Sequence, residues 1–430
     1  MKRINTTRIS GLMMVAILAA MLCGSCKKDD IAPIEGNMVY ATSDGDNLEE
    51  RIMFVAAYNN AIEDITSVGG NVFTATFTAP LTLIQDYAFG NCCNLTSIDI
   101  PEGVTTIGER AFDSCAHLAV ITLPQSLTSI GSRAYCRCWS LVSIDIPEGV
   151  TEIQTETFGG CSSLRNVVIP QNVSRIGDYA FYNCSNLADV VIPESVTSIG
   201  AEAFYRCGIY WITVPGGIDS INYGTFMECD NLQSVSLKDG IVEIGNSAFV
   251  GCTKLRTVNM ARTITAIRSN AFMDCKSLEY INLPRSLEWI GQYAFYGCES
   301  LASLTLPNGV THIDKYAFGD CKSLVSIKLG SGLTLIDDWV FQGCERLASL
   351  TVPENITKIG VQAFRDCKSL ASVTCESSVP PSISYYETFE NIAANATLHV
   401  PSGSVAAYQN STWGIYFPNI VGDAPAPSSR

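Results

Sequence analysis

Hydrophobic and polar residues alternate in short runs along most of the chain, and the runs recur at a fixed interval. Typical runs are Ile98-Asp99-Ile100 and Ile121-Thr122-Leu123. Alternation over three or four residues predicts a short β-strand with one buried face. A proline often follows, as at Pro101 and Pro124, and ends the strand because it cannot donate to a continuing ladder. The pattern therefore predicts many short strands at regular spacing.

An aromatic residue marks each copy of the pattern. The interval between successive aromatics is 23 residues, except for 22 residues between Phe204 and Phe226. A cysteine follows each aromatic by three residues, and a leucine usually stands three further on. A unit this short cannot bury its own apolar face, whereas stacked units share one core. The aromatics are Phe89, Phe112, Tyr135, Phe158, Phe181, Phe204, Phe226, Phe249, Phe272, Phe295, Phe318, Phe341 and Phe364.

The written-out unit, LxxIxLPxxVTxIGxxAFxxCxx, resembles the BspA-like, treponemal type of leucine-rich repeat over residues 80 to 376. This resemblance implies a right-handed solenoid of about thirteen coils over residues 86–376. It implies short parallel β-strands with turns or short helices, and places the LxxIxL strand on a concave face. It also implies a surface lipoprotein of Bacteroidetes, in a family described as adhesins toward extracellular-matrix proteins.

Both ends of such an array need covers, because an open end exposes core and unpaired strand edges. Residues 37–85 break the period, contain an alternating run from Phe73 to Phe77, and are predicted to form the N-terminal cap. Residues 377–421 hold a degenerate repeat around Phe389 and are predicted to form the C-terminal cap. The Pro/Ser-rich tail, 422–430, is predicted to be disordered.

The N-terminus has the features of a lipoprotein signal peptide over residues 1–25. Basic residues precede an apolar run that is too short to span a membrane, and two small residues precede Cys26. We expect Cys26 to carry the lipid and residues 26–36 to form a linker; the alternative is cleavage and secretion without a lipid. The charged residues after Cys26 resemble the export signals of Bacteroidetes surface lipoproteins, so we expect an outer-membrane protein exposed on the cell surface, attached through the lipid alone.

Thirteen of the eighteen cysteines belong to the repeat. Equivalent side chains on stacked coils point the same way, which is unsuitable for disulfides, and cysteines in a line do not form a tetrahedral metal site. We therefore expect the repeat cysteines to be reduced and buried, with no metal. Cys93 and Cys136 fall outside the repeat, and exposed thiols are possible there.

Charge and composition exclude several functions. The net charge of −15 repels phosphate backbones, so nucleic acid is not an expected ligand. The histidines, His117, His312 and His399, lie in separate segments, so we expect no catalytic residues, no enzyme activity and no cofactor. The glycine that recurs once per coil, as at Gly108 and Gly200, is predicted to form a corner with positive φ.

Two columns of strand residues are predicted to face solvent, and most of their members are small and polar. Val168, Val191, Trp211 and Tyr280 interrupt these columns, and the shortened coil adds Tyr210 beside Trp211. Exposed aromatics in a polar surround are typical of binding hot spots. We therefore predict a ligand-binding patch at these five residues, the alternative being that Tyr210 or Trp211 fills the space left by the deletion.

The sequence thus predicts a cell-surface binding or adhesion protein that presents a leucine-rich-repeat face to host or bacterial protein ligands, with a host extracellular-matrix protein among them. The alternative is a glycan-binding accessory lipoprotein that uses the aromatic residues as a stacking platform.

Overall fold

A computed structural model of the chain describes residues 38–43, 62–69, 72–77, 80–383 and 387–424. The signal peptide, Cys26 and the linker lie outside the described residues. The chain divides into two compact units. The first extends to Thr151 and also includes Gly160–Val168, and the second contains Glu152–Gly159 and the remainder from Ile169.

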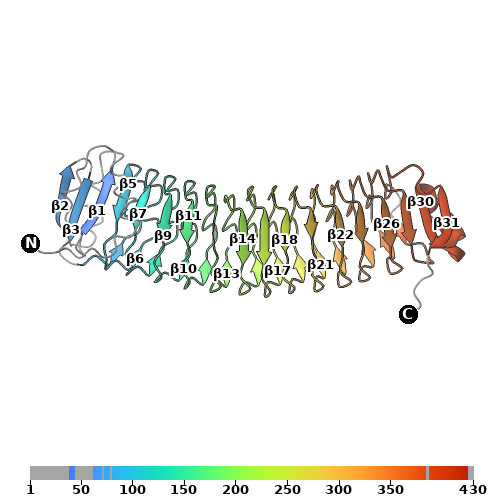
Figure 1. Cartoon of the computed structure of the whole chain (residues 1–430), viewed down its shortest axis with the longest axis horizontal. Helices are drawn as coiled ribbons and strands as arrows, with labels where there is room; N and C mark the ends of the chain where they lie inside the picture. The colour runs from blue at the N-terminus through green and yellow to red at the C-terminus, as the bar shows by residue number, and fades with distance from the viewer. Residues whose placement is uncertain (1–37, 44–61, 70–71, 78–79, 384–386, 425–430) are drawn as a thin grey trace, which may run out of the picture. The chain divides into compact units, whose positions relative to one another are not determined.

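The first unit begins with three antiparallel strands, in the spatial order β2-β3-β1, and β1 pairs antiparallel with β5 of the first coil (Figure 1). Strand β3 includes the run from Phe73 to Phe77, which confirms the strand predicted there. Strand β4 already stacks on β6, so the coils begin inside the segment predicted as a cap. The strands are β1 (Met38–Ser43), β2 (Ile62–Gly69), β3 (Val72–Phe77), β4 (Leu83–Ile84), β5 (Leu95–Asp99), β6 (Thr106–Ile107), β7 (Val120–Thr122), β8 (Ser129–Ile130), β9 (Ser143–Asp145) and β11 (Asn166–Val168).

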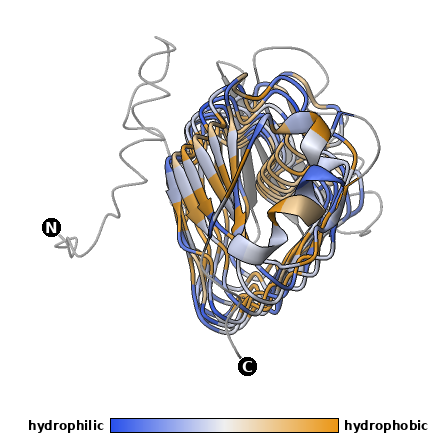
Figure 2. Cartoon of the chain, turned by 90° about the vertical axis from the view of Figure 1, so that its right-hand side faces the viewer, coloured by the Kyte–Doolittle hydropathy of each residue, from blue (hydrophilic) through white to orange (hydrophobic). Residues whose placement is uncertain are grey.

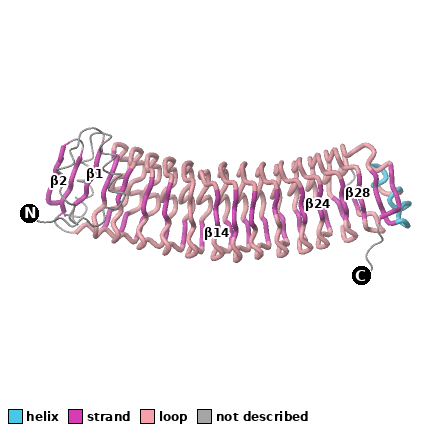
Figure 3. The backbone as a smooth tube through the Cα atoms, in the orientation of Figure 1, coloured by secondary structure: helices cyan, strands magenta, loops and turns pink. Residues whose placement is uncertain are grey.

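The coils of the second unit contribute two columns of parallel strands, visible in Figure 3. We call the column that contains the LxxIxL segments the first strand column. Its strands are β14 (Trp211–Val214), β16 (Ser234–Leu237), β18 (Thr257–Asn259), β20 (Tyr280–Ile281), β22 (Ser303–Thr305), β24 (Ser326–Lys328), β26 (Ser349–Val352), β28 (Ser372–Cys375), β30 (Thr397–Pro401) and β31 (Asn419–Ala424).

The second strand column has shorter strands, because each coil adds only two residues to it. These strands are β10 (Glu152–Ile153), β12 (Arg175–Ile176), β13 (Ser198–Ile199), β15 (Ser220–Ile221), β17 (Glu243–Ile244), β19 (Ala266–Ile267), β21 (Trp289–Ile290), β23 (His312–Ile313), β25 (Leu335–Ile336), β27 (Lys358–Ile359) and β29 (Ser382–Ile383).

Turns complete each coil, and the solenoid comprises about 15 coils, against the thirteen predicted. The additional coils arise because degenerate segments at the ends continue the strand columns. Among the described residues, helix occurs only after the last repeats, in η1 (Ser402–Ser404), α3 (Val405–Gln409) and α4 (Trp413–Tyr416).

The repeated aromatics form a continuous stack inside each unit. The rings of Phe89 and Phe112 lie 5.1 Å apart with an interplanar angle of 4°, and those of Phe249 and Phe272 lie 5.2 Å apart at 3°. All these side chains are buried. Stacking follows from the repeat because equivalent residues of adjacent coils are held at strand spacing.

The repeat cysteines bind the coils to one another through hydrogen bonds. The Cys115 thiol donates to the carbonyl oxygen of Phe89 at 3.0 Å, and Cys321 donates to Phe295 at 3.3 Å. Twelve of the thirteen are buried, and Cys92 is half-buried. No disulfide joins the cysteines within the part of the chain that the structure describes. A small side chain with one weak donor therefore fits this inner corner.

The two cysteines left open by the sequence differ from each other. Cys93 is exposed, whereas Cys136 is only 3% exposed, so a solvent-accessible thiol at Cys136 is excluded. The equivalent residue of the preceding coil, Asp113, is also buried. In these two coils, the short side chain directly after the repeated aromatic residue is therefore buried.

The prediction that the recurrent glycines adopt positive φ is wrong. Gly108 and Gly200 have no positive φ, but a Cβ atom would lie 2.5 Å from the backbone nitrogen of Asp86 at the first and 2.3 Å from that of Asp178 at the second. Close approach of adjacent coils thus selects glycine. Positive φ occurs instead at residues two positions before or after a repeated aromatic residue, for example at Tyr87 with φ 59°, two positions before Phe89.

The C-terminal segment packs on the last ring of the aromatic stack. The Phe389 ring lies 5.3 Å from that of Trp413 and 5.1 Å from that of Phe417. Trp413 is fully buried, and in Figure 2 the helices lie over the interior of the coils at this end. Strand β31 extends to Ala424, beyond the predicted boundary at residue 421, because it pairs with β30.

Candidate functional site

The solvent-facing positions of the first strand column form a mostly polar face in the second unit, which we call the sheet face. Its residues alternate with buried ones along each strand, as in the exposed, buried, exposed, buried pattern of β14. Although the chain is acidic, none of these positions between Trp211 and Thr374 is a carboxylate. The members are Trp211, Thr213, Ser234, Ser236, Thr257, Asn259, Tyr280, Asn282, Ser303, Thr305, Ser326, Lys328, Ser349, Thr351, Ser372 and Thr374.

Two aromatic side chains stand on this face in one row. Trp211 is 60% exposed and Tyr280 is 54% exposed. The strand register pairs Trp211 with Ser234, Ser234 with Thr257, and Thr257 with Tyr280. Three strand spacings separate the two aromatics, which is a distance of about 14 Å across a floor of small hydroxyl residues.

The shortened coil explains why Trp211 is exposed. Ile209 occupies the buried position that leucine holds in other coils and is fully buried. Tyr210 remains 39% exposed, and its ring lies 6.2 Å from that of Trp211. The alternative that Tyr210 or Trp211 fills the space left by the deletion is therefore wrong, since Ile209 fills it.

The two predicted valines belong to different units. Val191 is 75% exposed and lies one coil before Trp211, in the coil whose Ala188 carbonyl accepts a bond from the Tyr210 N–H at 3.3 Å. Val168 is 66% exposed and pairs with Asp145 in the first unit. The second unit thus brings together Val191, Tyr210 and Trp211, with Tyr280 further along the same face.

Some exposed aromatic residues outside the sheet face contact one another. In the second strand column, the Trp289 ring stacks on His312 at 5.1 Å, with Arg268 5.9 Å from its centroid. On the turns, Tyr293 stacks on Tyr316 at 4.8 Å. Because these ring faces are occupied by neighbouring side chains, less of their area is available to a ligand than at Trp211.

The buried thiols of the described residues are poorly suited to nucleophilic attack. Burial raises the pKa of the Cys115 thiol well above its usual value, which disfavours the thiolate that nucleophilic attack requires. His399 is bound to Asp423, with 2.7 Å between Nδ1 and Oδ1. Within the described ranges, no group of three or more His, Cys, Asp and Glu residues is placed to hold a metal ion.

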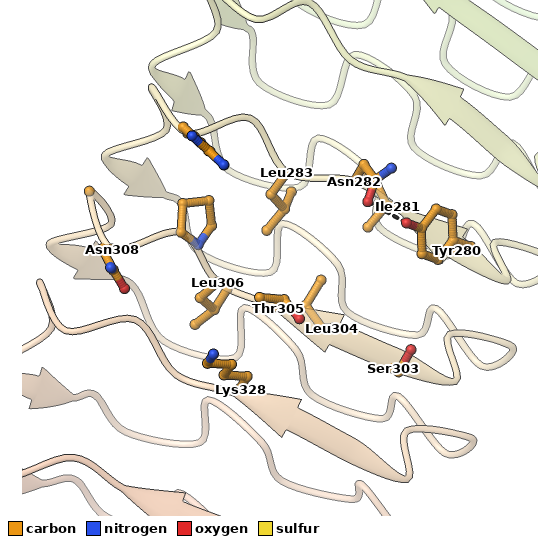
Figure 4. Close-up of a pocket in the computed structure, with 13 residues that line it drawn as sticks. Tyr280, Ile281, Asn282, Leu283, Ser303, Leu304, Thr305, Leu306, Asn308 and Lys328 are labelled. Carbon is orange, nitrogen blue, oxygen red and sulfur yellow. Dashed lines mark hydrogen bonds between the residues drawn. The ribbon is translucent and has the colours of Figure 1, made fainter.

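A depression of about 580 Å³ opens in the sheet face beside Tyr280 (Figure 4). It extends over β20 and β22 and reaches Lys328 on β24. Tyr280 was predicted from the sequence as a site residue, whereas Arg285, Asn282 and Lys328, which also line the depression, were not. Lys328 could have indicated this site from the sequence, because it is the one charged residue among the sixteen sheet-face positions.

Parallel strands, a period of 23 residues and an inner stack of aromatics define the class of this protein as a leucine-rich-repeat solenoid. The model of the BspA type leucine rich repeat region matches residues 82–210, 151–279 and 265–395, so the chain belongs to this family. The predicted family and fold are thereby confirmed.

Several solved structures are similar. A leucine-rich repeat protein from Bacteroides ovatus is 27% identical, with a TM-score of 0.51, 72% of this chain covered and 90% of that chain. The leucine-rich repeat protein of T. pallidum is 37% identical, covers 39% of this chain and 80% of that one, and has a TM-score of 0.36. A leucine rich cell surface protein from Faecalibacterium prausnitzii is 24% identical, covers 72% and 86%, and has a TM-score of 0.37. No curated protein matches the sequence of this chain.

Proposed function

We propose that this chain is a cell-surface adhesion protein whose sheet face binds a protein ligand, with extracellular-matrix proteins the first class to test. The observation that carries the proposal is Trp211, a large aromatic residue 60% exposed on a rigid strand within an otherwise small and polar face. Aromatic residues held in this way are the usual anchors of protein interfaces. Tyr210 and Val191 lie beside it and extend the apolar area.

The test compares two substitutions on the sheet face. Truncating a buried aromatic anchor commonly costs 2 kcal/mol or more, so Trp211→Ala should weaken binding at least about tenfold. Ser326→Ala, on β24 of the same face, should have almost no effect. Binding is measured by surface plasmon resonance against a panel of matrix proteins, with circular dichroism to confirm folding. Equal small effects from both substitutions would place the site elsewhere.

Glycan binding is the second candidate function. The observation that favours it is the spacing of Trp211 and Tyr280, about 14 Å apart with Ser234 and Thr257 between them. Two separated rings with hydroxyl groups between them suit an extended oligosaccharide, which stacks on each ring and hydrogen-bonds to the floor. A glycan array run beside the matrix-protein panel distinguishes the two candidates.

The proposed location is the outer surface of the outer membrane, reached through a lipid on Cys26. Cys26 follows two small residues and an apolar run, which supports lipid attachment. Among the described residues, no helix is long and apolar enough to cross a membrane. The lipid would hold the chain at the membrane, and the solenoid would carry the binding face.

The segments at the two ends of the solenoid are proposed to act as caps. Trp413 and Phe417 cover the last ring of the aromatic stack. At the other end, β1 pairs with β5. The first arrangement covers apolar surface and the second pairs backbone N–H and C=O groups, both of which a bare terminal coil would expose to water.

A further inference from the structure

The depression beside Tyr280 lies where the first strand column is interrupted. One sheet of the second unit ends at β20, and the next begins at β22, although the coils continue without a break in the sequence. Leu283, which follows β20, is half-exposed, whereas the equivalent Leu306 of the next coil is buried. Leu283 therefore provides an apolar floor that is partly open to solvent, with the polar lining residues around it.

Two cations line this depression. Arg285 and Lys328 are both exposed, and neither forms an ion pair with another residue in the part of the chain that the structure describes. Many other cations of the chain are paired, for example Lys322 with Glu299 at 3.1 Å. In a chain of net charge −15, two unneutralised cations beside one hollow form a local positive site on a stretch of the face, from Trp211 to Thr374, whose sixteen positions include no carboxylate.

The remaining lining groups suit a sugar. Asn282, Ser303 and Thr305 supply amide and hydroxyl groups that both donate and accept hydrogen bonds. Figure 4 shows Asn282, Thr305 and Lys328 following one another across three neighbouring coils, with Tyr280 at one side. The Tyr280 hydroxyl is bound to the Asn282 side chain, which fixes the orientation of the exposed ring.

We propose that this depression binds an anionic sugar residue of an oligosaccharide. Its carboxylate or sulfate would accept hydrogen bonds from Arg285 and Lys328, and the sugar ring would lie against Tyr280 and the Leu283 floor. Arginine contributes a planar fork that matches the two oxygens of a carboxylate, and lysine contributes a point charge. This inference specifies the sugar class and the site of the second candidate function.

The experiment uses the full chain and three carboxylate-bearing probes, namely oligogalacturonate, a hyaluronan oligosaccharide and oligosialic acid, each paired with its carboxyl-reduced form. A chondroitin sulfate oligosaccharide whose carboxyl groups have been reduced keeps sulfate as its only anionic group and so distinguishes sulfate from carboxylate, and polyglutamate tests for acidic peptide. At least one anionic oligosaccharide should bind, with affinity that falls as salt rises. Its uncharged form should bind about tenfold more weakly, as expected for loss of a charge-assisted hydrogen bond.

Substitutions locate the site. Arg285→Gln and Lys328→Gln should each weaken binding of the anionic oligosaccharide about tenfold, since each removes one cation from the depression. Lys276→Gln is the matched control, because it removes the same charge from an exposed turn and should leave affinity unchanged. Circular dichroism of each variant shows that it is folded.

Four results would overturn the proposal. These are binding of no anionic oligosaccharide, equal binding of a charged probe and its carboxyl-reduced form, equal weakening by Lys276→Gln, and polyglutamate binding with the same dependence on Arg285 and Lys328. If the reduced forms bind and Trp211→Ala abolishes that binding, glycan binding stands without the anionic site. If a matrix protein binds and no sugar does, the adhesion proposal stands alone.

Discussion

The free energy of unfolding should fall steeply as the pH rises, because the coils bury the thiols of most repeat cysteines. Burial raises the pKa of the Cys321 thiol from its usual 9.0 to about 12, and other repeat cysteines are raised in the same direction. Above pH 9 the unfolded chain loses these protons while the folded chain keeps them, so stability is lost as the pH rises toward 12. The ten repeat cysteines with raised pKa are Cys115, Cys138, Cys207, Cys229, Cys252, Cys275, Cys298, Cys321, Cys344 and Cys367.

The expected slope is large. Each thiol that ionises only in the unfolded state lowers the free energy of unfolding by about 1.4 kcal/mol per pH unit. Ten such thiols give at most about 14 kcal/mol per pH unit, which is as large as the whole stability of a typical domain, about 5–15 kcal/mol. Unfolding should therefore be complete within about one pH unit above 9.

The assay is urea unfolding followed by circular dichroism at several pH values, under reducing conditions. Replacing Cys298, Cys321 and Cys344 by serine keeps a donor for each carbonyl but removes three titrating groups. The slope should then fall by about 4 kcal/mol per pH unit. Cys93→Ser, at an exposed thiol, is the control and should leave the slope unchanged. Equal slopes in all three proteins, or a chain still folded about two pH units above 9, would refute the reasoning.

Three further predictions concern the ends and the coil packing. Trp413→Ala should lower the free energy of unfolding by about 3–5 kcal/mol, because this buried indole covers the aromatic stack; Ile415→Ala, at a 73% exposed residue, should change it by less than about 0.5 kcal/mol in the same urea titration. Gly200→Ala should cost about 1–3 kcal/mol, because its Cβ would lie 2.3 Å from a backbone nitrogen, whereas at Gly403 nothing lies within 4 Å and alanine should be tolerated. Cys26→Ala should move the protein from the membrane fraction to the soluble fraction on cell fractionation, and continued membrane association would contradict the lipid assignment.

The fold was predictable because the residues that each coil requires recur at the same positions from repeat to repeat. The buried positions, the strands and the inner location of the cysteines all follow from residues that recur in phase, such as Phe112 and Cys115. The reason for the recurrent glycine did not follow. A contact between the backbones of adjacent coils is not encoded in the pattern of one coil, so positive φ was the natural but mistaken explanation at Gly108.

The candidate site was predictable only in part. Trp211 and Tyr280 were found because they depart from a polar column, and both are exposed on the sheet face. The depression was not found, because it depends on where strand pairing is interrupted between β20 and β22. The sequences of the two coils keep the same period, so the repeat pattern does not reveal the interruption. Arg285 lies outside the strand columns, so no pattern pointed to it.

Hydrogen-bonded residues of adjacent coils lie a constant number of positions apart in the sequence, which makes the length of this protein easy to alter in evolution. The Thr105 N–H donates to Thr82 and the Thr128 N–H donates to Thr105, each at 2.9 Å and 23 residues away. Removing or duplicating one whole coil would recreate the same junction, so unequal recombination within the gene would shorten or lengthen the molecule without new contacts. A slip of one residue is also tolerated, since Cys229 still donates to Phe204 at 3.1 Å across the shortened coil.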